Sequence, residues 1–363
     1  MNVRVRVAQG DPVLALVYRR TWLGACAACA LTLFNALVLI VGPRFAGAPL
    51  GPAGTVVALQ YAFCLVPLSL WVYLAFPSLI EALFGRLAAS GALKDPQTGD
   101  LAANVRRWLH SPLLTVAAIA AVIGYWLYRP IWSIPGAVDL TEPIDPAALG
   151  PLRLWLILSL SPALYAGILA IMRLVIGLVF AWLLFQNCRL ELNPLDEDGS
   201  AGLAPVGELF TFTMVVSTIL GFIALGMSLA LLAVGISPFS FLETYGLFLL
   251  YAALLPTSVV VLLWLPHRVM LRARARFLQP LRDELARTLA QMGRVQAGGL
   301  DELKVGNEYV AELRRRYDLV EGMIPTWPLR LPVIRGLSIS ALIPLATALA
   351  NFLLHPATKP PSA

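Results

Sequence analysis

Three consecutive carboxylates, residues 196–198, stand in the acidic stretch LELNPLDEDGSAGLAPVGEL, which covers residues 190–209. The first and third carboxylates, followed by the hydroxyl of Ser200, have the alternate spacing that begins the calcium-binding loop of an EF-hand. Such a loop also needs glycine at its sixth position and glutamate at its twelfth. This chain has Ala201 and Gly207 at those positions. The spacing therefore argues against calcium, and we predict no metal site.

The same stretch also has the composition of a shaped turn between two helices. Asp side chains bond their own backbone, and Gly199 and Gly202 permit the positive φ angles of tight turns. A solvated acidic turn is one interpretation. The other is an interaction loop, whose carboxylates pair with arginines from elsewhere in the chain. The residues of this candidate loop are Asp196, Glu197, Asp198, Gly199 and Gly202.

Arg173 is the second residue that suggests chemistry, because it interrupts the apolar sequence AGILAIMRLVIGLVF. A charge near the centre of a bilayer costs at least about 2.5–3.5 kcal/mol unless it is paired or hydrated. Such residues often mark ion or solute pathways. The alternative is that the membrane span ends here and the side chain of Arg173 reaches out to the interface. We keep both interpretations, with Arg173 as a candidate pore residue.

Enzyme signatures are poor in this sequence. The histidines, His110, His267 and His355, are far apart, and no HExxH, GxSxG or P-loop motif is present. Cys26 and Cys29 form a CxxC inside an apolar segment, where an accessible reactive thiol is not expected. We therefore identify no catalytic residue and no cofactor, and a membrane enzyme is the least favoured class.

The composition requires a membrane around these residues. The chain has 363 residues, of which 59% are hydrophobic and only 13% are charged. A soluble domain has nearer a quarter charged residues, whereas a bilayer solvates apolar side chains on every face of a helix. The formal net charge of +6 fits basic loops beside anionic lipid. No basic patch is interleaved with stacking aromatics, so we expect the lipid bilayer as a partner and no nucleic acid.

The apolar runs predict an all-α polytopic protein with six or seven transmembrane helices. Each run is near or above the roughly 20 residues that cross the hydrocarbon core. Prolines at 67, 77, 162, 256 and 344 interrupt these runs, as in the broken helices of transporters and channels. The fourth run is too long for one straight crossing, so we expect a kink at Pro162 or a strong tilt. The predicted spans cover residues 21–41, 55–76, 112–134, 151–185, 206–234, 243–265 and, as a seventh that is transmembrane or re-entrant, 331–354.

The distribution of Lys and Arg predicts the orientation. Residues 1–20, the loop after the second span and the segment after the sixth span are all basic. The loop of residues 135–151 has three carboxylates and no basic residue. We therefore predict a multi-pass protein of a bacterial cytoplasmic (inner) membrane, with residues 1–20 as a cytoplasmic tail and residues 21–266 as the transmembrane domain.

The polar region of residues 267–330 is predicted to form a short cytoplasmic basic helical hairpin. Pro280 is expected to begin its first helix, because proline suits the first helical turn. The Gly-Gly pair at 298–299 should separate that helix from a second amphipathic one. The last hydrophobic segment, 331–355, and a tail, 356–363, complete the chain. The basic residues that we expect to pair with the acidic loop are Arg268, Arg272, Arg274 and Arg276.

Two segments resemble a group of uncharacterised bacterial multi-pass integral membrane proteins. In that group the loop reads His-Pro-Asp-Gly-x-Gly-Gly-Leu, and here Asp198, Gly199, Gly202 and Leu203 match it. Ala201 replaces one glycine, while Asp196 and Glu197 replace His and Pro. The later YDLVEGMIPTWPLRLPVIRGL has the Trp-Pro pair that the group shows before a last hydrophobic segment. The resemblance covers about the second half of the chain and implies no activity.

These features favour a channel- or transporter-like protein that conducts ions or small solutes and forms a homo-oligomer. The broken helices, Arg173 and the basic cytoplasmic segment support this hypothesis. The alternative is a non-transporting membrane scaffold or signalling protein. It would bind a cytoplasmic protein partner through its loop and hairpin.

Overall fold

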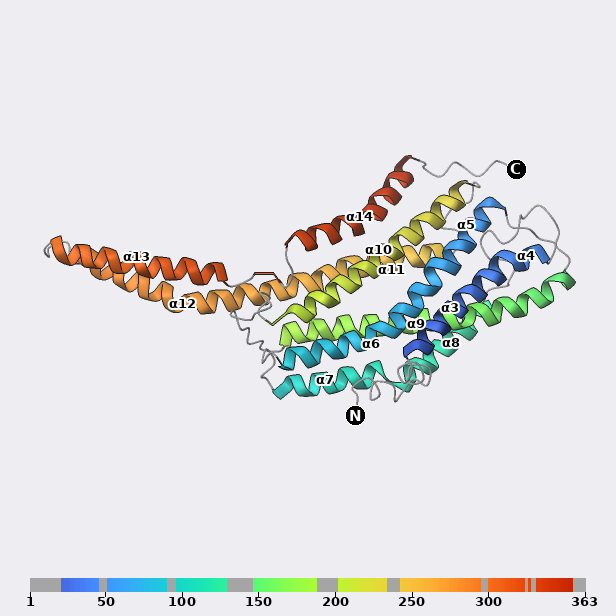
Figure 1. Ribbon diagram of the computed structural model, residues 1–363, viewed down its shortest axis with the longest axis horizontal. Helices are drawn as coiled ribbons and strands as arrows, with labels where there is room; N and C mark the ends of the chain where they lie inside the picture. The colour runs from blue at the N-terminus through green and yellow to red at the C-terminus, as the bar shows by residue number, and fades with distance from the viewer. Residues whose placement is uncertain are drawn as a thin grey trace.

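A computed structural model describes residues 21–45, 51–89, 96–128, 146–187, 202–233, 242–294, 300–323, 326–327 and 331–354. Within these residues the regular structure is entirely helical, which confirms the predicted fold class (Figure 1). The α-helices are α3 (Thr21–Ala36), α4 (Gly42–Phe45), α5 (Pro52–Gln60), α6 (Val66–Ala89), α7 (Pro96–Leu109), α8 (Pro112–Tyr128), α9 (Pro146–Asn187), α10 (Ala204–Ala233), α11 (Leu242–Val259), α12 (Leu265–Arg294), α13 (Leu300–Met323) and α14 (Leu331–Leu354).

Six helical runs in the described part of the chain are long and apolar enough to cross a membrane. Because these runs are apolar and long enough to span a bilayer, the fold is that of a multi-pass membrane protein. Each of the six predicted strong spans overlaps one of these runs. The runs cover Ala25–Arg44, Gly54–Ala89, Asp100–Leu127, Leu154–Asn187, Ala204–Ala233 and Tyr245–Met292.

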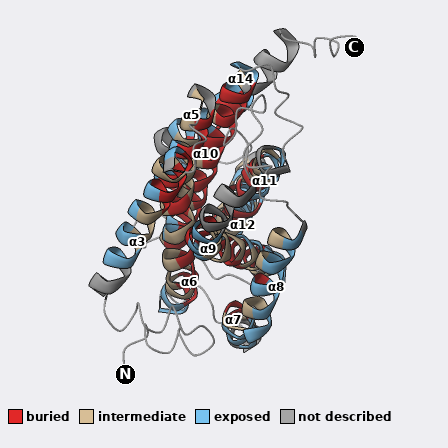
Figure 2. Ribbon diagram, turned by 90° about the vertical axis from the view of Figure 1, so that its right-hand side faces the viewer, coloured by how far each residue is buried: buried red, intermediate tan, exposed pale blue. Residues whose placement is uncertain are grey.

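Helix α10 is the centre of the bundle. In the most apolar 18-residue stretch of α10, 56% of the residues are buried (Figure 2). The corresponding share in the run that contains α8 is 11%. Its polar side chains fit this position because Thr213, Ser217 and Ser228 each donate to the carbonyl four residues earlier in the same helix. The hydroxyls therefore need no partner from a neighbouring helix.

Helices α6 and α9 lie side by side and run in the same direction through the bundle (Figure 1). Gly167 lies against Ser69, and Gly177 against Phe76 and Ile80 further along both helices. Helix α9 has 42 residues, so it is about 63 Å long, twice the thickness of a hydrocarbon core of about 30 Å. It continues unbroken through Pro162, whose side chain is exposed. The long fourth run is therefore one extended helix.

Three π-helical turns interrupt the described helices, and each ends two residues before a proline. They are η1 (Leu37–Val41), η2 (Tyr61–Leu65) and η5 (Val260–Trp264), and the prolines are Pro43, Pro67 and Pro266. A proline ring clashes with the carbonyl four residues earlier and donates no backbone bond. The wider turn moves that carbonyl away, so the helix passes the proline without ending.

Helices α12 and α13 form an antiparallel hairpin that extends beyond the rest of the molecule (Figure 1). Side-chain cross-links hold the pair, among them Arg274 to Glu321 at 2.7 Å and Arg282 to the hydroxyl of Tyr317 at 2.7 Å. The hairpin differs from the sequence prediction at Pro280, which lies inside α12 and does not begin a helix. Helix α12 continues from α11 through η5, so the sixth span and the first arm of the hairpin are one rod.

A third cross-link joins Tyr309 of α13 to Glu284 of α12. The phenol donates to the carboxylate at 2.5 Å, and this bond, with the negative charge of Glu284, raises the pKa of Tyr309 above its ordinary value of 10.0.

Helix α14 packs along α10, and α11 contacts it through Tyr251. Tyr251 of α11 donates to the backbone carbonyl of Ala341, and Gly221 of α10 lets Pro344 approach closely. The apolar part of α14 among the described residues, Ile334–Thr347, is shorter than the six candidate spans. Whether α14 crosses the membrane stays a prediction.

Candidate functional site

A buried polar cluster forms where α7 ends against α6 and α9. Helix α7 was not predicted from the sequence, which was interpreted there as a basic loop. Its end follows from Pro112, because a proline disfavours the helical conformation in the residue before it. The Oγ of that residue, Ser111, accepts a hydrogen bond from the backbone N–H of Leu113 at 3.3 Å and so caps α8. The chain therefore turns at His110 and places this side chain against α6.

Glu81 is the acidic member of the cluster. Glu81 belongs to α6, and only 6% of its side chain is exposed. The Nε2 atom of His110 is 3.2 Å from Oε1 of Glu81, and the Nε atom of Arg106 is 3.6 Å from the same oxygen. A buried carboxylate is tolerated when it is paired in this way with basic groups.

The direction of the Glu81–His110 hydrogen bond follows from the charge of Glu81. An ionised carboxylate only accepts, so Nε2 of His110 donates to Glu81 when Glu81 is charged. The Nδ1 atom of His110 is buried, and the described residues offer it no hydrogen-bond partner. Among the described residues, Nε2 is thus the ring nitrogen through which His110 contacts the cluster.

Arg173 lies on α9 close to the same junction. Its side chain is buried, with 1% of the residue exposed, and its Nε donates to the carbonyl of Leu109 at 3.3 Å. Its guanidinium carbon lies 5.0 Å from the ring centroid of Tyr73 on α6. The described structure thus places the Arg173 side chain in protein, between three helices. Its depth in the membrane and a role in a pore stay predictions.

The contacts of Arg173 explain how a cation is held among apolar helices. Leu109 is the last residue of α7, and the carbonyls at a helix C-terminus carry a partial negative charge. The face of an aromatic ring is also negative and attracts a guanidinium. Arg173 therefore joins the end of α7 to α6 and α9. Its contact is with Leu109, the residue before His110.

Comparison with known proteins finds no relative. No family model, curated protein or solved structure matches this chain. The chemistry of the cluster therefore has to be argued from its own geometry.

Most of the acidic loop lies outside the described residues, including Asp196, Glu197, Asp198 and Gly199. Gly202 is described and has a φ of 84°, the left-handed conformation expected of it. The docking of this loop on the basic segment stays a prediction.

The four arginines predicted as partners of that loop have different surroundings. Arg268, Arg272 and Arg276 are exposed on α12. Arg274 is half-buried, and its Nη2 bonds both the carboxylate and the backbone carbonyl of Glu321. One of the four is thus already engaged within the hairpin.

The Trp-Pro pair that carried part of the resemblance begins at Trp327, and this ring has a clear structural role. It stacks on His267 with ring centroids 3.7 Å apart and an interplanar angle of 11°. The Nδ1 atom of His267 donates to the carbonyl of Thr326 at 2.6 Å. These contacts bring the chain after α13 back to the start of α12, so that both arms of the hairpin are fixed at the bundle.

Sequence reasoning missed Glu81 and did not assign His110 a role. One signal was present: Glu81 is the only acidic residue of the run Gly54–Ala89, although it lies beyond the predicted span of residues 55–76. The partner is 29 residues away, and only the unpredicted helix α7 brings it back to α6.

Proposed function

We propose that this multi-pass membrane protein is transporter- or channel-like, that it moves a small solute or an ion, and that the Glu81–His110 pair is its proton-sensitive element. The observation that carries the proposal is this pair, buried at 3.2 Å inside a candidate span. Ionisable groups buried in membrane bundles are expensive and commonly mark solute pathways or proton relays.

The surroundings of the pair support the same proposal. Arg106 faces Glu81 from α7, and Arg173 approaches from α9 through the end of α7. A second ion pair, Arg86 to Glu208 at 2.6 Å, joins α6 to α10 nearer the hairpin and is exposed. A change in the charge of Glu81 or His110 would alter the contact that holds α7 on α6, which is a means of coupling a proton to helix movement.

Proton or ion flux in liposomes that contain the purified full-length chain tests the proposal. A pH gradient is imposed, and internal pH and membrane potential are followed with dyes. We expect flux whose rate depends on pH, and we expect Glu81→Gln and His110→Gln each to remove that dependence because the shared proton is lost. Glu308→Gln, an exposed acidic position on α13, is the matched control and should behave as the unmodified chain. Absence of flux under every ion and pH gradient contradicts the proposal.

A scaffold or signalling function is the second candidate, and the projecting α12–α13 hairpin favours it (Figure 1). Apolar side chains on the hairpin are exposed, among them Leu289, Val305 and Leu319. Such side chains favour contact with another protein, either a soluble partner or a second copy of this chain. Replacement of residues 279–318 by a short Gly-Ser connection should abolish a specific pull-down partner if this function holds. A pull-down that is indifferent to the deletion counts against it.

The orientation belongs to the same proposal. We infer that residues 1–20 and the hairpin lie on the cytoplasmic side of a bacterial inner membrane. The arginines at the start of α12 support this, because cationic residues are retained on that side.

A further inference from the structure

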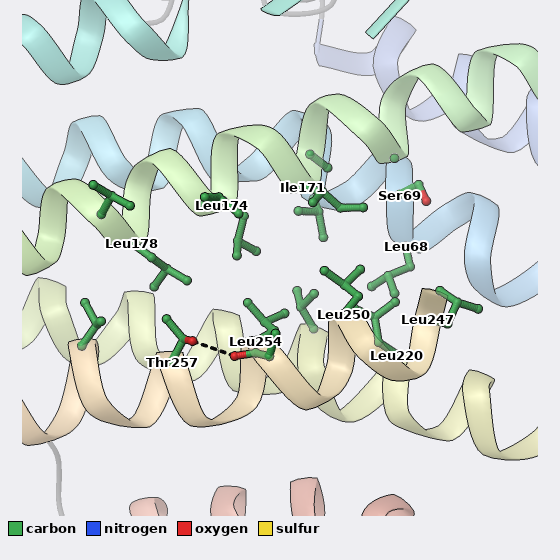
Figure 3. A pocket seen from close by; sticks show the side chains of 18 of the residues that line it. Leu68, Ser69, Ile171, Leu174, Leu178, Leu220, Leu247, Leu250, Leu254 and Thr257 are labelled. Carbon is green, nitrogen blue, oxygen red and sulfur yellow. Dashed lines mark hydrogen bonds between the residues drawn. The ribbon is translucent and has the colours of Figure 1, made fainter. Parts of the chain in front are cut away.

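An apolar cavity of about 310 Å³ lies between α9 and α11, with α6 and α10 forming its floor (Figure 3). Its volume is at the lower end of the range of about 300–1,000 Å³ found for ligand sites. The side-chain oxygens on its wall are those of Ser69 and Thr257, and the latter donates within its own helix to Ala253 at 2.7 Å. The wall has no charged side chain, so it suits a hydrocarbon chain.

The cavity opens sideways, toward the surface that lipid covers. On α9 its rim consists of large apolar side chains that are between 40 and 51% exposed, namely Ile171, Val175, Val179 and Trp182. On α11 the rim includes Ala253 and Thr257, which are also exposed. Since these positions belong to candidate spans, the medium outside the rim is the acyl-chain region of the bilayer.

The rod that forms one wall of the cavity continues into a row of arginines. Leu250, Leu254, Thr257 and Val261 line the cavity at steps of three or four residues. Further steps of this kind reach Arg268 and Arg272, which therefore lie on roughly the same side of the rod. The π-helical turn η5 rotates the helix face between Val261 and these arginines by only part of a turn.

The distance along the rod fits a single phospholipid. Arg268 is seven residues beyond Val261, about 10 Å along the helix. Headgroup layers add about 10–15 Å in total to a hydrocarbon core of about 30 Å, so a cation at this distance meets the headgroups. Among the described residues, Arg268 and Arg272 have no ion-pair partner. Trp264, exposed between the cavity and the arginines, is a residue type enriched at this interface.

We propose that this structure contains a specific site for one anionic phospholipid of the bilayer, with an acyl chain in the α9–α11 cavity and the phosphate at Arg268 and Arg272. Hydrocarbon burial provides binding, and the two cations provide the preference for an anionic headgroup. The site is independent of the proposed transport and requires only the membrane setting.

Native mass spectrometry of the delipidated full-length protein in detergent tests the site. The probes are phosphatidylglycerol and phosphatidylcholine with identical acyl chains. We expect phosphatidylglycerol to bind about thirtyfold more tightly, because each cation near the headgroup contributes about fivefold. Arg268→Gln/Arg272→Gln should remove this preference, because it weakens the binding of phosphatidylglycerol more than that of phosphatidylcholine. Arg314→Gln/Arg315→Gln, at exposed positions on α13, is the matched control and should keep the preference.

A second pair of variants tests the cavity. Ala253→Phe places a ring at the rim and should reduce the binding of both lipids, whereas Ala252→Phe, exposed on the same helix but outside the cavity lining, should not. Thermal unfolding of each variant confirms that it is folded. Equal affinity for the two lipids overturns the headgroup site, and so does a preference that survives Arg268→Gln/Arg272→Gln. Undiminished binding to Ala253→Phe overturns the cavity as the chain site.

Discussion

Arg173 is a buried arginine in a candidate membrane span, and it contacts a helix end and an aromatic ring. The Leu109 carbonyl accepts from Nε, and the Tyr73 ring lies against the guanidinium plane. Through Leu109, the residue before His110, these contacts connect Arg173 to the Glu81 cluster. A structural role and a role in conduction are therefore both compatible with its position, and they differ in what its removal changes.

Replacement of Arg173 separates these roles. Arg173→Ala removes the bond to Leu109, the contact with Tyr73 and most of the buried side-chain volume. We expect a loss of about 2–5 kcal/mol of stability, as for other large-to-small changes in a core. If Arg173 also serves conduction, flux in liposomes per folded molecule changes as well. Arg173→Lys keeps the charge but lacks the flat guanidinium, so its stability should be intermediate.

Unfolding temperature in detergent and flux in liposomes are measured on the same preparations. Flux per folded molecule that is unchanged in Arg173→Ala removes Arg173 from the pathway and leaves it a structural residue. An unfolding temperature equal to that of the unmodified chain contradicts the structural role.

At the scale of the helices, the close packing of α6 on α9 depends on Gly177. A Cβ atom at Gly177 would lie 2.6 Å from Cζ of Phe76 and 3.0 Å from Cδ1 of Ile80. Real Cβ atoms do not approach a ring so closely, so a larger residue must push the helices apart or force the ring out of position. This contact fixes the relative position of the helices that carry Glu81 and Arg173.

Gly177→Ala should therefore destabilise the protein by about 1–3 kcal/mol through overpacking. Gly124→Ala on α8 is the matched control, because no heavy atom lies within 4 Å of the added Cβ there. The control should be neutral or gain up to about 1 kcal/mol from helix propensity. Thermal unfolding in detergent measures both. An unfolding temperature for Gly177→Ala at or above that of Gly124→Ala would show that the α6–α9 contact yields without cost.

The elements that could be predicted from the sequence are those that depend only on local length and polarity. The six strong spans belong to this class, because an apolar run of sufficient length has no other stable state in lipid. The prediction that Pro280 begins a helix was wrong, because this exposed proline lies inside α12. Packing of α12 against α13 supports the helix on both sides of the proline. Helix α7 was missed because its apolar face is narrow, and with it went the Glu81–His110 pair, which depends on a chain reversal.

The whole molecule combines an apolar bundle with a polar hairpin at one end. Two of the described ion pairs lie toward this end or on the hairpin itself, namely Arg86 to Glu208 and Arg274 to Glu321. The basic start of α12 is at the same end. A chain built in this way has one favoured orientation, because arginines placed beside the bundle resist translocation and favour the leaflet with anionic lipid.

The orientation of the whole molecule is tested by reaction of single cysteines with a membrane-impermeant maleimide. Lys304→Cys, exposed on α13, reports on the hairpin. Asp139→Cys reports on the segment of residues 135–145, which precedes α9. In intact cells we expect Asp139→Cys to react and Lys304→Cys to react only after the membrane is permeabilised, since the basic end is retained inside. The reverse pattern places the hairpin outside, where a cytoplasmic partner cannot bind it. The starting variant for both has alanine at the native cysteines, Cys26, Cys29, Cys64 and Cys188.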